Sequence, residues 1–113
     1  MAHLSLATSR TGQTAVIELT GELDLAGAAA LEQELARLEG ESPRAVVLDL
    51  REVEFMDSSG LRLIAVASQR AKERGRRLAL VPGSEQVMRV FEITRMRERL
   101  DFVDGPEEVT RAA

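Results

Sequence analysis

Residues 45–50, AVVLDL, form an almost continuous apolar run that only Asp49 interrupts. A run of this length and composition is typical of a central strand that is covered on both faces, as in the parallel sheets of α/β proteins. The rest of the chain then has to provide the neighbouring strands and the helices that cover them.

The segment before this run predicts a β-hairpin followed by a helix. Two strands are expected around a turn at Gly12, because AVIEL in the second half is rich in β-branched and apolar residues. A helix is expected over about residues 25–39, because apolar side chains recur there at the spacings of one helical face. The residues of that face are Leu31, Leu35 and Leu38.

The segment after the run predicts further alternation of helices and strands. The patterns indicate a helix from Ser59 to about Arg74, a strand in RRLALV, a helix capped by Ser84 and Glu85, a weak strand over 101–105 and a terminal helix over 106–113. The predicted order is β-β-α-β-α-β-α-β-α. Such alternation predicts a single α/β domain over residues 1–113, with a mixed, largely parallel sheet and helices packed against it.

Composition excludes several classes of function. The net charge of -4 and the pI near 5.1 argue against a nucleic-acid partner, which would usually meet a basic surface. With one histidine, His3, the chain cannot assemble a histidine-based triad or a multi-histidine metal site. Cysteine is absent, and no apolar window approaches the roughly 18 residues of a membrane span. We therefore expect a cytoplasmic protein without a membrane span.

The stretch FMDSSG, residues 55–60, lies between a predicted strand and a predicted helix. Asp and Ser are favoured at helix N-caps, so capping is one interpretation. A nucleophilic serine is a second interpretation, but the G-x-S-x-G elbow is missing and no histidine is placed to act as the base. Phosphorylation is the third, because a phosphoserine at a helix N-terminus meets free backbone amides and the positive end of the helix dipole.

The segments VVLDLREVEFMDSSGLRLI and GELDLAGAAALEQEL resemble the anti-sigma factor antagonist family, the bacterial regulators built on the STAS domain. The resemblance implies that Ser58 is the phosphoacceptor of a serine kinase, which is itself the anti-sigma factor. That kinase, of the GHKL type, would supply the ATP and the magnesium. The dephosphorylated form would capture it and release a sigma factor, and a PP2C-type phosphatase would reset the cycle. The chain itself would be a switch, with no cofactor and no enzymatic activity.

The resemblance also suggests a partner-binding surface. Asp57 is expected to cap the helix or hold the loop, and Ser59 to act as a hydrogen-bonding neighbour of the acceptor. Gly60 either leaves room for the partner's nucleotide or allows tight helix packing. Glu22 and Asp24 in GELD are interpreted either as a solvated turn with a helix cap or as the border of the same partner surface.

Two positions depart from the pattern of the family. Many similar proteins carry glycine where Arg62 and Arg95 stand, and we expect Arg62 to influence the choice of partner. The cluster of basic residues around the end of the second helix is interpreted as a solvated helix end rather than an anion site; it comprises Arg70, Lys72, Arg74, Arg76 and Arg77. The alternative function is a constitutive STAS scaffold or a subunit of a stress-signalling or transport complex without a serine switch. A nucleotide-binding role is disfavoured because there is no P-loop, and a monomer is expected.

Overall fold

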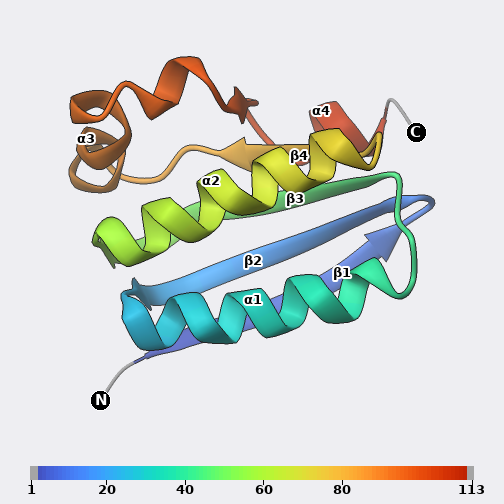
Figure 1. Ribbon diagram of the computed structural model, residues 1–113, viewed down its shortest axis with the longest axis horizontal. Coiled ribbons are helices and arrows are strands. Elements are labelled where there is room, and N and C mark those ends of the chain that lie inside the picture. Colours follow the sequence, from blue (N-terminus) through green and yellow to red (C-terminus); the bar gives the residue numbers. More distant parts are fainter. Residues whose placement is uncertain (1–2, 112–113) are drawn as a thin grey trace.

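In the computed structural model, which describes residues 3–111, one five-stranded sheet lies behind two long helices that run side by side (Figure 1). The strands are β1 (Leu4–Thr11), β2 (Thr14–Leu23), β3 (Ala45–Met56), β4 (Arg77–Val81) and β5 (Asp101–Phe102). The helices are α1 (Leu25–Glu39), α2 (Ser58–Glu73), α3 (Glu85–Ile93) and α4 (Glu107–Thr110), with a 3₁₀ turn, η1, at Met96–Glu98. Within these described residues, no helix combines the length and apolar content needed to cross a membrane.

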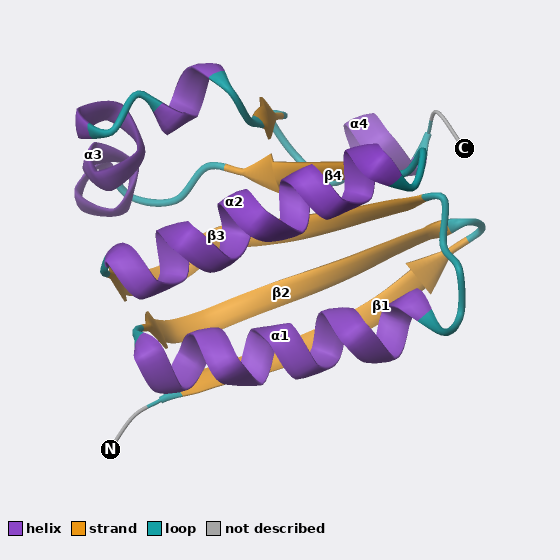
Figure 2. Ribbon diagram, in the orientation of Figure 1, coloured by secondary structure: helices purple, strands orange, loops and turns teal. Residues whose placement is uncertain are grey.

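The order of the strands in the sheet is β1-β2-β3-β4-β5, the same as their order in the chain. Strand β1 pairs with β2 in the antiparallel sense, and the other three pairings are parallel. Figure 2 shows this mixed sheet with α1 and α2 across its front. The predicted fold class and the predicted alternation of elements are therefore confirmed.

The apolar core lies mainly between the sheet and α1 and α2. Leu48 and Leu50 of β3 are fully buried there, against side chains that include Leu31 and Ile64 from the two helices. Each fully buried leucine contributes about 1.5–3 kcal/mol to folding. On the other face of the sheet, a smaller cluster includes Val47 and, from α4, Val109. The AVVLDL run is thus covered on both faces, as its composition predicted.

Strand β3 is longer than predicted, because it continues from Leu50 to Met56 through a stretch rich in charged residues. Two register shifts against β2 explain the difference, and each places one extra residue on β3: Glu18 and Thr20 pair with Asp49 and Glu52, and Gly21 and Glu22 pair with Val53 and Phe55. Such bulges interrupt the alternation of inward and outward side chains by which a strand is recognised.

Asp49, the polar residue in the apolar run, is buried and bound to the arginine two positions later. Its carboxylate accepts hydrogen bonds from Arg51 Nη2 at 2.7 Å and Nε at 3.0 Å, and from the Arg51 backbone N–H at 3.1 Å. Burial tends to raise the pKa of Asp49, but these bonds outweigh it and hold the pKa below its ordinary value. The pairing explains how a carboxylate is tolerated in a central strand.

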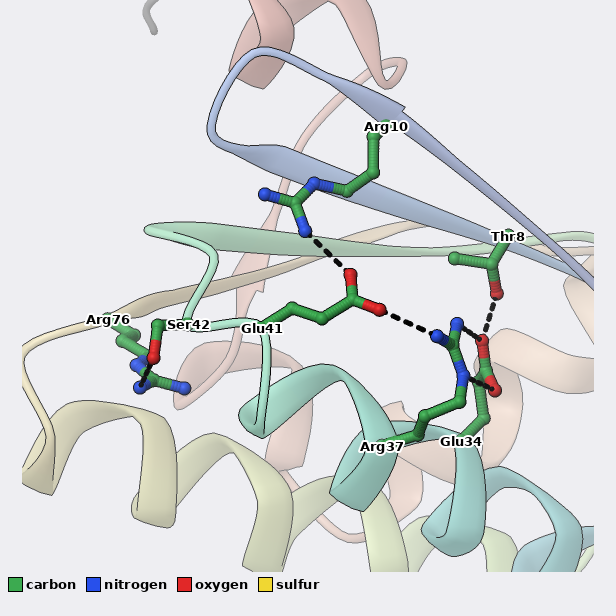
Figure 3. Close-up of polar contacts among 7 residues, drawn as sticks. All are labelled: Thr8, Arg10, Glu34, Arg37, Glu41, Ser42 and Arg76. Atoms are coloured by element: carbon green, nitrogen blue, oxygen red, sulfur yellow. Dashed lines mark hydrogen bonds and ion pairs between the residues drawn. The ribbon is translucent and has the colours of Figure 1, made fainter.

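A polar network attaches α1 to the β1–β2 hairpin (Figure 3). Glu34 accepts hydrogen bonds from Arg37 at 2.6 and 2.9 Å and from the Thr8 hydroxyl at 2.5 Å. Arg37 also pairs with Glu41 at 2.8 Å, and Glu41 with Arg10 at 2.9 Å. The bonds from Arg37 and then Thr8 lower the pKa of Glu34 from 4.5 to about 2. Glu34 therefore stays ionised well into the acid range.

The C-terminal part departs from the prediction in three details. The 3₁₀ turn η1 follows α3 and was not predicted. The last strand has two residues rather than the five expected over 101–105. The terminal helix spans Glu107–Thr110, and residues 112 and 113 of the predicted helix lie outside the described residues.

Candidate functional site

The two sequence motifs GELD, residues 21–24, and FMDSSG, residues 55–60, meet at one edge of the sheet. There the carboxyl ends of β2 and β3 lie beside the N-termini of α1 and α2, on the left in Figure 1. Leu23 pairs with Met56, and the Asp57 backbone N–H donates to the Leu23 carbonyl at 3.4 Å. In parallel α/β sheets, this is the edge where binding sites generally form.

Asp57 is the N-cap of α2, as its position predicted. One carboxylate oxygen, Oδ1, accepts hydrogen bonds from the backbone N–H groups of Ser59 at 2.9 Å and Gly60 at 3.4 Å. Asp24 is the N-cap of α1 in the same way, with its carboxylate accepting from the Gly27 N–H at 2.9 Å. The capping interpretation is confirmed for both aspartates, and each places a negative charge at a helix N-terminus.

Ser58 is the first residue of α2, and its side chain is exposed. Since Asp57 supplies the cap, the helix does not depend on the Ser58 hydroxyl for that role. Ser59 is half-buried, and its backbone N–H is the one held by Asp57. The two serines therefore differ: Ser58 faces solvent at the helix start, whereas Ser59 is held closer to the capping group.

Gly60 lies beneath the site. A Cβ atom placed on it would be 2.7 Å from both Cγ and the carbonyl oxygen of Leu23, and 2.9 Å from Met56 Cγ. These distances are too short for a carbon side chain, so the start of α2 packs closely on the ends of β2 and β3 only because residue 60 is glycine. The structure supports tight packing as the role of Gly60.

The other predicted site residues lie around Ser58. Glu22 is exposed and pairs with Phe55 in the register of β2 and β3, and Asp24 is half-buried at the start of α1. Arg62 is exposed and follows Ser58 by one helical turn, which places both on the same face of α2. Six of the seven predicted residues thus lie around this edge or on the adjoining turn of α2, and Gly60 lies below it.

Two apolar residues at this edge were not predicted. Leu25, the first residue of α1, is 74% exposed, and Phe55, near the end of β3, is 43% exposed. Large apolar side chains exposed next to polar groups are typical of protein-binding surfaces. The sequence held a signal for Leu25, because it does not belong to the series of leucines that forms the inward face of α1. Phe55 gave none, because the bulges in β3 hide its orientation.

Chemically, the edge offers an exposed hydroxyl at a helix N-terminus, three nearby carboxylates, one arginine and two exposed apolar side chains. The carboxylates are those of Glu22, Asp24 and Asp57. This arrangement suits the recognition of another protein and the modification of the hydroxyl. The chain contains no cysteine, and its one histidine, His3, adjoins this edge through its backbone carbonyl, which accepts a hydrogen bond from the Glu22 N–H at 3.1 Å.

Comparison with known proteins shows which families and proteins this chain is similar to. A family model described as "Mlab, STAS domain" matches residues 6–104. The anti-sigma-F factor antagonist RsfB of Mycobacterium tuberculosis is 43% identical over 56 residues, which are 50% of this chain and 46% of that protein, so the match spans about half the length of either. The anti-sigma-B factor antagonist of Staphylococcus aureus is 26% identical over 105 residues, which are 93% of this chain and 97% of that protein.

Solved structures share the fold at lower identity. SpoIIAA, an anti-sigma factor antagonist, superposes in its unphosphorylated form with a TM-score of 0.80, at 21% identity over 96% of both chains. The phosphorylated form of SpoIIAA from Bacillus superposes with a TM-score of 0.72, at 20% identity over 98% of this chain and 100% of that one. A sulfate transporter family protein from Wolinella succinogenes gives 0.75, at 20% identity over 89% and 84% of the two chains. The extent of the family match shows that this chain belongs to the STAS domain family.

Proposed function

We propose that this chain is an anti-sigma factor antagonist that is switched off by phosphorylation of Ser58. The observation that carries the proposal is the position of Ser58, exposed at the first residue of a 16-residue helix whose cap is supplied by Asp57. A kinase can therefore modify the hydroxyl without removing a bond on which the helix depends. The curated relatives, which are named as antagonists of anti-sigma factors, support the same role.

Phosphorylation at this position would change the surface more than the fold. The first backbone N–H groups and the positive end of the α2 dipole favour a negative charge at Ser58. The phosphate adds about -1.5 to -2 charges to an edge that already carries the carboxylates of Glu22, Asp24 and Asp57. Two unit charges about 4 Å apart at an effective dielectric of about 20 interact by roughly 4 kcal/mol, which corresponds to about a thousandfold in affinity.

The partner in this proposal is an anti-sigma factor that is also a serine kinase of the GHKL type and brings its own ATP and magnesium. The dephosphorylated chain binds it and releases a sigma factor, and a PP2C-type phosphatase restores that state. Leu25 and Phe55 supply the apolar contacts of the interface, and Glu22, Asp24 and Arg62 supply its charged border. The chain acts in the cytoplasm as a substrate and a binding protein rather than as an enzyme.

The test compares Ser58→Ala and Ser58→Asp as baits in lysate of the native host, with mass spectrometry of the captured proteins. We expect the alanine form to retain an ATP-binding anti-sigma kinase and the aspartate form to lose it. Calorimetry with the purified kinase then measures both affinities. Ser59→Ala and Ser59→Asp are the matched controls, because they make the same chemical changes at the neighbouring hydroxyl.

The outcome that contradicts the switch is equal affinity of the two Ser58 variants for the kinase. Capture of the same scaffold or transport components by both variants would favour the alternative function, a constitutive STAS module without a serine switch. Leu25→Ser and Phe55→Ser separate the surface from the switch, since both should weaken capture by the Ser58→Ala form without changing the phosphoacceptor.

A further inference from the structure

The loop between α1 and β3, residues 40–44, carries an exposed serine in an unusual backbone conformation. Ser42 has a φ of 52°, in the left-handed region that disfavours a residue with a side chain. Its backbone N–H donates to the Glu39 carbonyl at 3.2 Å, which holds this conformation just after the end of α1. Glycine would adopt it at lower cost, so the backbone alone gives no reason for serine at this position.

The Ser42 hydroxyl faces a guanidinium. Arg76 Nη2 donates a hydrogen bond to Ser42 Oγ at 3.4 Å, and Figure 3 shows the two side chains meeting from two different loops. Within residues 3–111, Arg76 forms no ion pair with a carboxylate, whereas Arg74 and Arg77 on either side of it do. The charge of Arg76 is therefore opposed only by a neutral hydroxyl.

The carboxylates closest in the chain to this hydroxyl already have cationic partners. Glu39 is bound by Arg74 at 2.8 Å, and Glu41 by Arg37 at 2.8 Å. Arg44, two positions after the serine, is exposed and forms no ion pair among the described residues. An anion on the hydroxyl would therefore meet positive charge that no carboxylate neutralises.

We propose that Ser42 is a phosphorylation site in addition to Ser58, with the phosphate bound by Arg76. A serine kinase transfers the γ-phosphoryl group of ATP to Ser42 Oγ. The bond from the γ-phosphorus to the bridging oxygen breaks and the bond to Oγ forms; ADP leaves, and the hydroxyl proton passes to the base of the kinase. The phosphate offers three acceptor oxygens and about -1.5 to -2 charges, and a guanidinium binds such a group through two parallel hydrogen bonds.

The Arg76 guanidinium decides whether this phosphate is tolerated. Ser42 follows the C-terminus of α1, where the negative end of the helix dipole opposes an added negative charge. Direct hydrogen bonds from Arg76 offset this opposition and join the α1–β3 loop to the residue before β4. The phosphate would thus fasten two loops that the unmodified hydroxyl connects by a single long hydrogen bond.

This site is separate from the proposed switch and does not depend on it. Helix α2 runs from Ser58 to Glu73, roughly 22 Å at a rise of about 1.5 Å per residue, and Arg76 follows its far end. A kinase docked around Ser58 does not place its active site on Ser42 in the same complex. We therefore expect a different serine kinase to modify Ser42.

The first test is mass spectrometry of the chain purified from its native host and digested with trypsin. Cleavage at the arginines yields residues 38–44, LEGESPR, in which Ser42 is the only hydroxyl, and residues 52–62, which contain Ser58. We expect phosphate on residues 38–44 in a fraction of the molecules. The Ser42→Ala chain from the same host is the control, and it should lose this phosphate without losing that on residues 52–62.

The second test uses protein made with phosphoserine at position 42. An opposite charge favours the dianionic phosphate, so we expect Arg76→Gln to raise the second pKa of the phosphoserine by about half a unit in ³¹P NMR titration. Arg89→Gln removes the same charge from an exposed position on α3 and should not shift it. The phosphate should also lower the melting temperature more in the Arg76→Gln protein than with Arg76 in place, because the helix dipole then acts on it unopposed.

Either of two results would overturn the proposal. The first is the absence of phosphate on residues 38–44 of chain purified from growing and from stressed cells, although a synthetic phosphopeptide of the same sequence added to the digest is detected. The second is identical ³¹P titrations of phosphoserine 42 with Arg76 and with glutamine at that position, which would show that the guanidinium does not bind the phosphate.

Discussion

The Asp57 carboxylate accepts a hydrogen bond from the Ser59 N–H at 2.9 Å and so caps the start of α2. The exposed Ser58 lies between these two residues in the chain. Replacement by alanine leaves that N–H without its partner. We expect Asp57→Ala to lower the free energy of unfolding by about 1 kcal/mol, seen as a fall of about 4 °C in melting temperature. Asp57→Asn keeps an accepting oxygen and should retain most of the stability. Unchanged melting of the alanine variant would show that the cap contributes nothing.

For Gly60→Ala, close packing and helix propensity predict changes in stability of opposite sign. Alanine is favoured over glycine in a helix by about 1 kcal/mol. At this position, however, a Cβ would lie 2.7 Å from the Leu23 carbonyl oxygen, and backbone cannot easily move away. We expect Gly60→Ala to destabilise the protein by about 2 kcal/mol in urea unfolding. Ser59→Ala, in the same turn, should change the stability by less than about 0.5 kcal/mol. A stabilised Gly60→Ala protein would contradict the close packing.

Arg95 adopts a left-handed backbone conformation, with φ of 63°, at the residue before η1. A residue with a side chain is disfavoured there, and glycine is not. The resemblance to the anti-sigma factor antagonists led us to expect glycine at this position. We expect Arg95→Gly to stabilise the fold by about 0.5–1 kcal/mol, measured by thermal and urea unfolding. Arg99→Gly, at a right-handed position with φ of -98°, should not stabilise it. Equal effects of the two changes would show that the backbone conformation is not the cause.

The lowered pKa of Glu34 predicts a loss of stability in acid. Folding lowers this pKa from 4.5 to about 2, chiefly through the bonds from Arg37 and Thr8, so the folded state binds fewer protons between these values. The stabilisation is therefore complete above about pH 4.5 and is lost as the pH falls towards 2. Urea unfolding at pH 7, 4 and 3 should show a smaller acid loss for Glu34→Gln than for the wild type.

The control for this acid effect is Glu92→Gln, which changes a more exposed carboxylate whose pairing with Arg97 is looser, at 3.7 Å. The acid loss of this variant and that of Glu34→Gln are measured side by side. If Glu34→Gln retains the full acid loss, the network in Figure 3 does not contribute to it.

Arg62 lies one turn after Ser58, on the same face of α2. A phosphate on Ser58 would therefore have a guanidinium within reach, and an opposite charge favours the dianionic form. We expect Arg62→Gln to raise the second pKa of the phosphoserine by about 0.2–0.4 units, measured by ³¹P NMR titration of protein made with phosphoserine at position 58. Lys72→Gln, near the far end of the helix, should not shift it. Identical titrations of wild type and Arg62→Gln would exclude the pairing.

Much of the fold could be predicted because its signals are local. The spacing of Leu31, Leu35 and Leu38 defined α1, and the apolar run before Arg51 defined the buried half of β3. Asp24 and Asp57 are favoured capping residues directly before helical patterns, and both cap a helix. These features depend on the nearest neighbours in the chain, which the sequence displays directly.

The features that escaped prediction depend on how distant segments fit together. The bulges in β3 arise from pairing with β2, and they decide that Phe55 faces outward while Met56 is buried. The grouping of Glu22 with Ser58 was expected from the resemblance, and its geometry became visible only when β2 and β3 ended at the same edge.

The strands lie in the sheet in the same order as in the chain, and this order affects how the protein can fold during translation. Every strand pairs with the one that precedes it in the chain, so each new strand emerging from a ribosome finds its neighbour already synthesised. We expect the sheet to assemble in the direction of translation, beginning with the β1–β2 hairpin and without waiting for a distant segment. The apolar side chains on the second face of β3 and β4 are covered by residues from the last part of the chain, Val103 after β5 and Val109 of α4. A nascent chain stalled before residue 101 would therefore expose this face, and it is the stage at which chaperone binding and aggregation should be greatest.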